Sequence, residues 1–162
     1  MADGNIICLW FPYLSVEIIF KDNQFFKTKP FAAISTENRK QTLYSINNVG
    51  KSIGLKPGMS LNEANTLCSN LITRKRNVYK EISFMESLLD WGNQFTPLIA
   101  IEKPNTLILN IKGCMNLLND KKVFLRNINV YFKNINITCF SGLANNSIIA
   151  KSLSRLSTKK EK

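Results

Sequence analysis

The sequence contains no histidine, and its 11 acidic residues are outnumbered two to one by 22 lysines and arginines. Its four cysteines form no Cys-x-x-Cys pair, so the common zinc-binding patterns are missing. A zinc site would need all four thiols to converge from widely separated apolar segments. Buried, reduced cysteines in an intracellular protein are the expected state. The four are Cys8, Cys68, Cys114 and Cys139.

Long hydrophobic runs are also missing. No apolar run approaches the roughly 18 residues that a membrane span needs, so no membrane partner is expected. The N-terminus lacks the basic start of a signal peptide, and its apolar stretch is interrupted by Pro12 and closed by Glu17. A cytoplasmic protein is therefore expected.

The charge is strongly one-sided, with a net charge of +11 and a pI near 9.7. Such an excess favours a polyanionic partner, nucleic acid above all. The chain is rich in Lys, Asn and Ile together, however, which AT-rich coding sequence alone can produce. The charge is therefore compatible with DNA binding without indicating it.

Apolar periodicity predicts an α+β fold. The predicted elements are a strand over 6–11, a helix over about 79–95, strands over 98–102 and 107–112, a helix within about 116–133, a strand over 135–140, and a closing helix marked by Ile148, Ile149, Leu153 and Leu156 with Lys151 and Arg155 on its polar side. In the second hairpin strand, Leu107, Leu109 and Ile111 face one side. The order βαββαβ is that of a ferredoxin-like fold.

The segment between the first strand and the first long helix contains its own turn and boundary residues. Lys29-Pro30 leads into a strand, and the Gly- and Pro-containing stretch 54–58 separates two short helices. The predicted organisation is one domain of 1–11 and 79–158, an α/β insert of 12–78, and a polar tail of 159–162. Such a fold is compatible with many functions.

Three segments point to a family. They are 11–17, which ends in Val-Glu after an aromatic residue, 49–61, with a Gly-x-x-x-Gly-x-x-x-Gly-Met pattern, and 95–114, which ends in Gly-Cys. In order and spacing they resemble the motifs of Y-family DNA polymerases, and segments 9–12 and 90–97 resemble those of the ImuB type in particular. The resemblance implies a palm-like domain with a fingers-like insert after the first strand.

The resemblance also assigns the metal ligands. It places the metal-binding aspartate of active members at Cys8 and their paired Asp-Glu at Asn105 and Thr106, so all three carboxylates are missing. Two-metal nucleotidyl transfer needs oxygen ligands that are preferably charged. Glu102 is the nearest acid, but strand alternation predicts that it faces away from Asn105. No metal cofactor is therefore expected. Mg²⁺ would be a cofactor only in the alternative case, in which other residues replace the missing metal ligands.

The triphosphate contacts implied by the resemblance are reduced as well. The fingers tyrosine of the family falls on Asn48, the neighbouring arginine on Lys51, and the palm lysine on Ser147. Lys51 keeps a positive charge but not the bidentate fork of arginine. Tyr13 matches the aromatic residue that screens the sugar in active members, and a packed tyrosine is the alternative interpretation.

Basic residues supply the candidate contacts to DNA phosphates. One group lies near the return from the insert and the other in the closing helix, and solvated helix faces are the alternative for both. The candidates are Arg74, Lys75, Arg76, Lys151 and Arg155.

The leading hypothesis is a non-catalytic Y-family-like protein in DNA repair or damage-induced (SOS) mutagenesis. It would bind DNA without sequence specificity, or bridge an active polymerase and other translesion-synthesis proteins. A residual nucleotidyltransferase with displaced metal ligands and an interaction module that does not bind DNA are the alternatives. Family members continue with thumb and little-finger domains, so a fragment or a reduced protein is expected.

Overall fold

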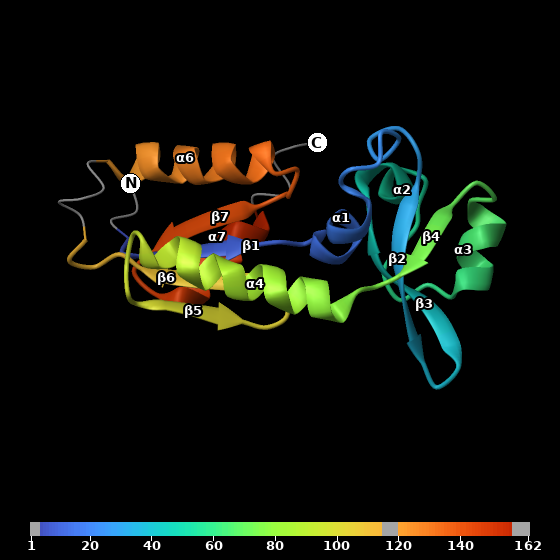
Figure 1. Cartoon of the computed structure of the whole chain (residues 1–162), viewed down its shortest axis with the longest axis horizontal. Coiled ribbons are helices and arrows are strands. Elements are labelled where there is room, and N and C mark those ends of the chain that lie inside the picture. The colour runs from blue at the N-terminus through green and yellow to red at the C-terminus, as the bar shows by residue number, and fades with distance from the viewer. Residues whose placement is uncertain (1–3, 115–119, 157–162) are drawn as a thin grey trace. The chain divides into compact units, whose positions relative to one another are not determined.

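The computed structural model describes residues 4–114 and 120–156, and it divides the chain into two compact units (Figure 1). The first unit comprises Met1–Pro12 and Ile82–Lys162, and the second comprises Tyr13–Glu81. These boundaries lie one and three residues beyond those expected, at 11/12 and 78/79. No helix within the described ranges is long and apolar enough to cross a lipid bilayer.

The first unit is built on a four-stranded antiparallel sheet. Its elements are β1 (Ile6–Trp10), α4 (Val78–Asn93, whose first turn belongs to the second unit), β5 (Ile99–Glu102), β6 (Thr106–Asn110), α6 (Lys121–Asn134), β7 (Phe140–Ala144) and α7 (Ser147–Leu156). The strand order is β5-β6-β1-β7, with every neighbouring pair antiparallel. This is the arrangement of a split βαββαβ fold, so the predicted fold class is confirmed.

One face of this sheet supports an aromatic core under α4 and α6. The side chains of Leu107, Leu109 and Ile111 are fully buried, as their alternation predicted. Phe11 lies edge-on to Phe132 of α6 with ring centroids 5.0 Å apart. Further ring contacts at 4.9–6.1 Å connect α4 and the residues after it with α6 and with Phe11, and they involve Phe84, Trp91, Phe95, Phe124 and Tyr131.

The opposite face of the sheet is covered in part by α7, which packs on β7 and β1. Its buried residues are the small Ala150 and Ser154, and a Cβ added at Gly142 would lie 2.1 Å from the Ala150 carbonyl oxygen. The helix was predicted correctly, but its faces were not. The aliphatic residues that marked it are exposed, because the helix backbone lies too close to β7 for large side chains. These residues are Ile148, Ile149, Leu153 and Leu156.

The strand predicted over 135–140 was placed wrongly, because β7 begins at Phe140. Asn136 has a positive φ of 56°, which no strand accommodates, and Ile137 is buried as part of the connection. Burial in an irregular connection thus produced the alternating pattern. The preceding helix, expected within 116–133, spans Lys121–Asn134, and the start of the expected range lies outside the described residues.

The second unit is a three-stranded sheet with helices on both faces. Its elements are α1 (Leu14–Phe20), β2 (Phe31–Glu37), β3 (Lys40–Ile46), α2 (Asn48–Ser52), α3 (Leu61–Leu67) and β4 (Ile72–Lys75). The order is β3-β2-β4, with β2 antiparallel to β3 and parallel to β4. The two short helices predicted around 54–58 are therefore present.

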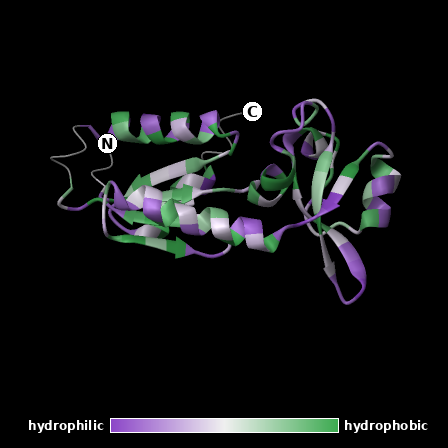
Figure 2. Cartoon of the chain, viewed as in Figure 1, coloured by the Kyte–Doolittle hydropathy of each residue, from purple (hydrophilic) through white to green (hydrophobic). Residues whose placement is uncertain are grey.

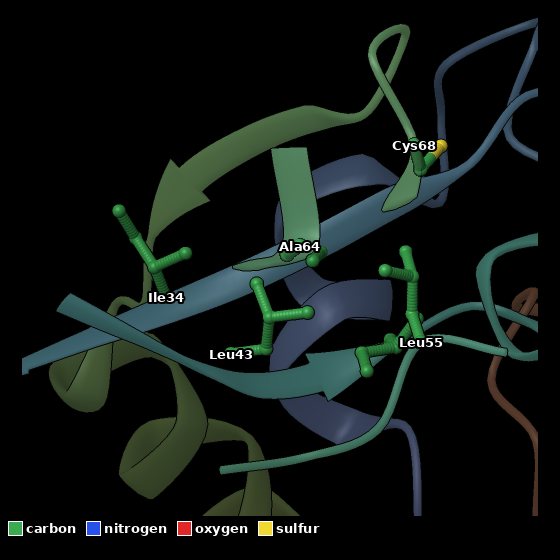
Figure 3. Packing of buried hydrophobic residues seen from close by; sticks show 7 residues of the cluster. Ile34, Leu43, Leu55, Ala64 and Cys68 are labelled. Carbon is green, nitrogen blue, oxygen red and sulfur yellow. The ribbon is translucent and has the colours of Figure 1, made fainter. Parts of the chain in front are cut away.

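The central strand β2 supplies both cores of this unit, which explains its continuous apolar start, Phe-Ala-Ala-Ile. Phe31 and Ala33 pack with Val16 and Phe20 of α1. Their neighbours Ala32 and Ile34 point to the other face. There they join a cluster with Leu43, Ile46, Leu55, Ala64 and Cys68 (Figure 3).

Candidate functional site

Cys8 lies at the centre of the sheet in the first unit and is fully buried. Ala144 and Ala150 pack around it, and its Sγ lies 3.5 Å from the Ser154 hydroxyl oxygen. Burial raises the pKa of the Cys8 thiol, and the hydrogen bond with Ser154 only partly offsets this. The position that the resemblance assigns to a metal-binding aspartate therefore holds a neutral, inaccessible thiol.

Asn105 and Thr106, the other two assigned positions, hold the hairpin end of the sheet together. The Asn105 side-chain amide donates to the Phe11 carbonyl oxygen at 2.9 Å, and the Phe11 amide donates to the Asn105 carbonyl oxygen at 3.0 Å. Thr106 is buried and pairs with Trp10 across the β1–β6 ladder. Both residues therefore have structural roles in the sheet.

Glu102 lies on the same sheet face as Cys8 and Thr106, two of the three assigned positions. Its register partner is Thr106, whose own partner on β1 is Trp10. Directly paired residues share a face, and Cys8 precedes Trp10 by two positions on the same side. These pairings do not contradict the expectation that Glu102 faces away from Asn105, because Asn105 is the chain neighbour of Thr106 and successive strand residues point to opposite faces.

The Glu102 carboxylate forms an ion pair with Lys151 of α7. The Lys151 ammonium nitrogen lies 3.0 Å from both carboxylate oxygens, and both side chains are partly exposed. The pair joins the sheet to α7 across 49 positions of sequence. Lys151, predicted as a DNA contact on the polar side of its helix, therefore has a carboxylate partner within the chain.

These donors do not fit a pair of magnesium ions. Mg²⁺ requires oxygen ligands in a near-octahedral arrangement and usually takes carboxylates. The assigned positions offer a buried thiol, an amide and a buried hydroxyl, and the neighbouring carboxylate is bound to an ammonium group. Among residues 4–114 and 120–156, no three His, Cys, Asp or Glu side chains are grouped to hold a metal.

Two of the predicted nucleotide-contacting residues meet in the second unit. The Lys51 ammonium nitrogen lies 4.1 Å from the centroid of the Tyr13 ring, a cation–π contact. Although Lys51 as a residue is exposed, burial of its ammonium group lowers its pKa. Asn48 is exposed at the start of α2. Ser147 belongs to the first unit, where it begins α7.

The residue that positions α2 was missed by the sequence reasoning. Asn47, buried before the helix, accepts hydrogen bonds through Oδ1 from the Phe31 and Gly50 amides, each at 3.0 Å. Its Nδ2 donates to the carbonyl oxygens of Phe26 at 2.7 Å and Lys29 at 2.8 Å. Asparagine immediately before a short helix is a recognisable N-cap signal.

The predicted DNA contacts of the second unit differ in availability. Arg76 donates through Nε to the Glu81 Oε1 at 3.2 Å and through Nη2 to Oε2, and it stacks on the Tyr44 ring at 3.6 Å. Burial by itself would lower the pKa of Arg76, but the hydrogen bonds and the charge of Glu81 outweigh it, so the Arg76 pKa is raised. Arg74 and Lys75 are exposed on β4. Arg76 is thus engaged internally, whereas Arg74 and Lys75 are exposed, and the Arg74 guanidinium carbon lies 5.6 Å from the centroid of the Phe20 ring.

Arg155, the last predicted DNA contact, is exposed near the end of α7. Its guanidinium carbon lies 5.3 Å from the centroid of the Trp10 ring, and Nη1 donates to the Lys151 carbonyl oxygen at 3.2 Å. The stacking fixes the side chain along the sheet face while leaving part of the guanidinium in solvent.

Similar folds occur among solved DNA polymerases. A post-insertion binary complex of Dbh DNA polymerase matches with a TM-score of 0.83 and 19% identity, DinB from Sulfolobus solfataricus with 0.81 and 18%, and a Y-family Dbh–Dpo4 chimera with 0.79 and 18%. Each match covers 93% of this chain but only 45% of the polymerase. The chain therefore spans less than half the length of these structures.

No curated protein gives a significant match to the sequence. The profile of the impB/mucB/samB family, by contrast, matches residues 11–155. This range includes the whole second unit and the first unit from the end of β1 to the last turn of α7. The chain therefore belongs to the impB/mucB/samB family.

Proposed function

We propose that the protein is a non-catalytic member of its family that acts in DNA damage tolerance, binding DNA or bridging an active polymerase. The observation that carries the proposal is the chemistry around Cys8. The assigned ligand positions provide no carboxylate, and Glu102, the acid on that face, is neutralised by Lys151. A site without free negative charge does not gather two divalent cations.

Primer extension tests the loss of catalysis. With a primer–template duplex and either Mg²⁺ or Mn²⁺, no nucleotide incorporation is expected. Incorporation that Glu102→Ala abolishes would overturn the proposal and establish the alternative, a nucleotidyltransferase with displaced ligands. Glu86→Ala is the matched control, because Glu86 is an exposed acid on α4 without a described ion pair.

DNA binding is supported by the exposed cations and by the DNA-polymerase complexes among the similar structures. Arg74 and Lys75 are exposed neighbours in β4 whose side chains point to opposite faces of the sheet, and neither has a carboxylate partner in the described ranges. Each cation that neutralises a phosphate adds about 0.9 to the dependence of log affinity on log salt concentration. The double variant Arg74→Ala/Lys75→Ala should therefore lower this slope by about 1 for each of the two side chains that contacts a phosphate.

Fluorescence anisotropy with a labelled primer–template duplex, from low to moderate salt, measures that slope. Lys27→Ala/Lys56→Ala removes the same charge from exposed lysines of the same unit and should reduce the slope less. Absence of binding at low salt would refute DNA binding. It would favour the alternative that the protein is an interaction module that does not bind DNA. We further propose that the protein acts in the cytoplasm and uses no metal cofactor.

A further inference from the structure

Helix α6 is held in the first unit by one face only. Phe124, Ile128 and Phe132 recur every four residues and are buried. Phe124 contacts Phe95 at 4.9 Å, and Phe132 contacts both Phe11 and Trp91 at 5.0 and 5.3 Å. This packing fixes which side of α6 points outward.

The outward side combines aliphatic and basic side chains. Val123 and Val130 are 44% and 51% exposed, and they lie seven positions apart on one stripe. Arg126 and Lys133 are exposed and follow each valine by three positions. The stripe thus alternates apolar and cationic groups at steps of three and four residues, and Figure 2 shows the helix banded in hydrophilic and hydrophobic colours. We call these four residues the α6 stripe.

The α6 stripe carries positive charge that the described part of the chain does not neutralise. The helix contains no Asp or Glu, and Asp120 before it is used as an N-cap, accepting from the Lys122 amide at 2.7 Å. Neither Arg126 nor Lys133 has an ion pair with a described carboxylate. Exposed Lys122 adds a further charge beside Val123. The helix therefore presents an uncompensated basic surface with two aliphatic contacts.

We propose that the α6 stripe binds an acidic amphipathic helix of a protein partner. A helix laid along it would set aliphatic residues seven apart against Val123 and Val130, and carboxylates between them against Arg126 and Lys133. DNA phosphates would use the cations but gain nothing from the valines. A lipid surface requires larger inserted apolar side chains, and on α6 Phe124, Ile128 and Phe132 are buried while the 39% exposed Tyr131 stacks on Trp91.

The expected contact is short and therefore weak. The 14 residues of α6 span about 21 Å, at about 1.5 Å per residue, which accommodates about four turns of a partner helix. Interfaces of this size are typical of transient complexes. This inference rests on the bridging role in the proposed function, for which it names a binding surface. Binding of a partner helix to the α6 stripe does not depend on whether the chain binds DNA or has lost catalysis.

The test uses the full chain and a fluorescein-labelled 18-residue helical peptide of Glu, Leu and Ala, with Leu seven apart and Glu between. A scrambled peptide of the same composition is the reference. The wild-type protein should bind the patterned peptide at least about fivefold more tightly. Arg126→Glu/Lys133→Glu should weaken that binding at least tenfold, since each exposed ion pair contributes up to about 1 kcal/mol and reversal makes it repulsive. Val123→Ser/Val130→Ser should weaken it about fivefold with charge unchanged.

Lys27→Glu/Lys56→Glu imposes the same change of net charge on exposed lysines of the second unit and should weaken binding less than twofold. Circular dichroism and thermal unfolding check that every variant is folded. Equal affinity for both peptides, or equal loss in the charge-reversal control, would overturn the proposal. So would competition by duplex DNA together with loss of DNA affinity in the α6 variants, since α6 would then be a DNA surface. Binding of anionic vesicles that the valine variants abolish would assign it to lipid instead.

Discussion

Replacing Asn47 by alanine tests whether one buried amide positions α2, the helix that holds Asn48 and Lys51. Asn47 is 3% exposed, and its side chain makes four hydrogen bonds to the backbone at 2.7–3.0 Å. Two of them link α2 to β2 and to its own first turn, and two hold the loop before β2. Alanine removes all four and offers no substitute.

The magnitude follows from how well water can replace each bond. The Phe31 and Gly50 amides are buried, so each loses a hydrogen bond worth about 1 kcal/mol and gains part of the 1–3 kcal/mol cost of an unsatisfied buried donor. The Phe26 and Lys29 carbonyl oxygens are only partly buried and can be hydrated, so their loss costs little. We expect Asn47→Ala to lower the free energy of unfolding of the second unit by about 3 kcal/mol.

Hydrogen exchange of backbone amides is the suitable assay, because a chain of two units need not unfold in a single step. The Phe31 and Gly50 amides should exchange roughly a hundredfold faster in Asn47→Ala, since 1.4 kcal/mol corresponds to a factor of ten. Asn48→Ala, one position along and exposed, is the control and should leave both amides unchanged. A loss below 1 kcal/mol in Asn47→Ala would refute the assignment of Asn47 as the residue that fixes α2.

Two further predictions concern buried polar groups. The Ser45 hydroxyl is buried without a hydrogen-bond partner among the described residues, so Ser45→Ala should stabilise the protein by about 1 kcal/mol in urea unfolding, and a loss of stability would contradict this. Burial raises the pKa of Cys8 above its ordinary 9.0, so the folded protein keeps the thiol proton to higher pH than the unfolded chain does. Its unfolding free energy should therefore fall as pH rises through 9, and less so in Cys8→Ala; parallel pH profiles of the two proteins would disprove a buried, protonated thiol.

Most of the fold could be predicted because its signals are local. The alternation of Leu107, Leu109 and Ile111 and the helical spacing in α4 and α6 reflect burial of one face, which sequence records directly. The strand at 135–140 failed because Ile137 is buried in an irregular connection, and burial alone does not identify a strand. The faces of α7 failed because backbone contact at Gly142 admits only small residues, which no periodicity shows.

The residue types at the candidate site could be predicted from the sequence, but the ion pair between Glu102 and Lys151 could not. The motif spacing placed Cys8, Asn105 and Thr106 at the assigned ligand positions, and all three lie at the centre or hairpin end of one sheet. That Glu102 shares the face of Cys8 and Thr106 and binds Lys151 depends on the hairpin register and on the docking of α7. Contacts between residues 49 positions apart are set by tertiary structure, not by spacing.

The sequence by itself determined the element order of the first unit and the position of the insert, because these follow from residue type and local periodicity, and the family resemblance assigned the ligand positions at which carboxylates are missing. Tertiary structure alone decided which cations remain in solvent. Arg76 and Lys151 are paired with Glu81 and Glu102, whereas the α6 stripe has no carboxylate partner among residues 4–114 and 120–156. The physical reason is that an ion pair requires two side chains to meet within a few ångströms, and only the packed fold fixes which ones do.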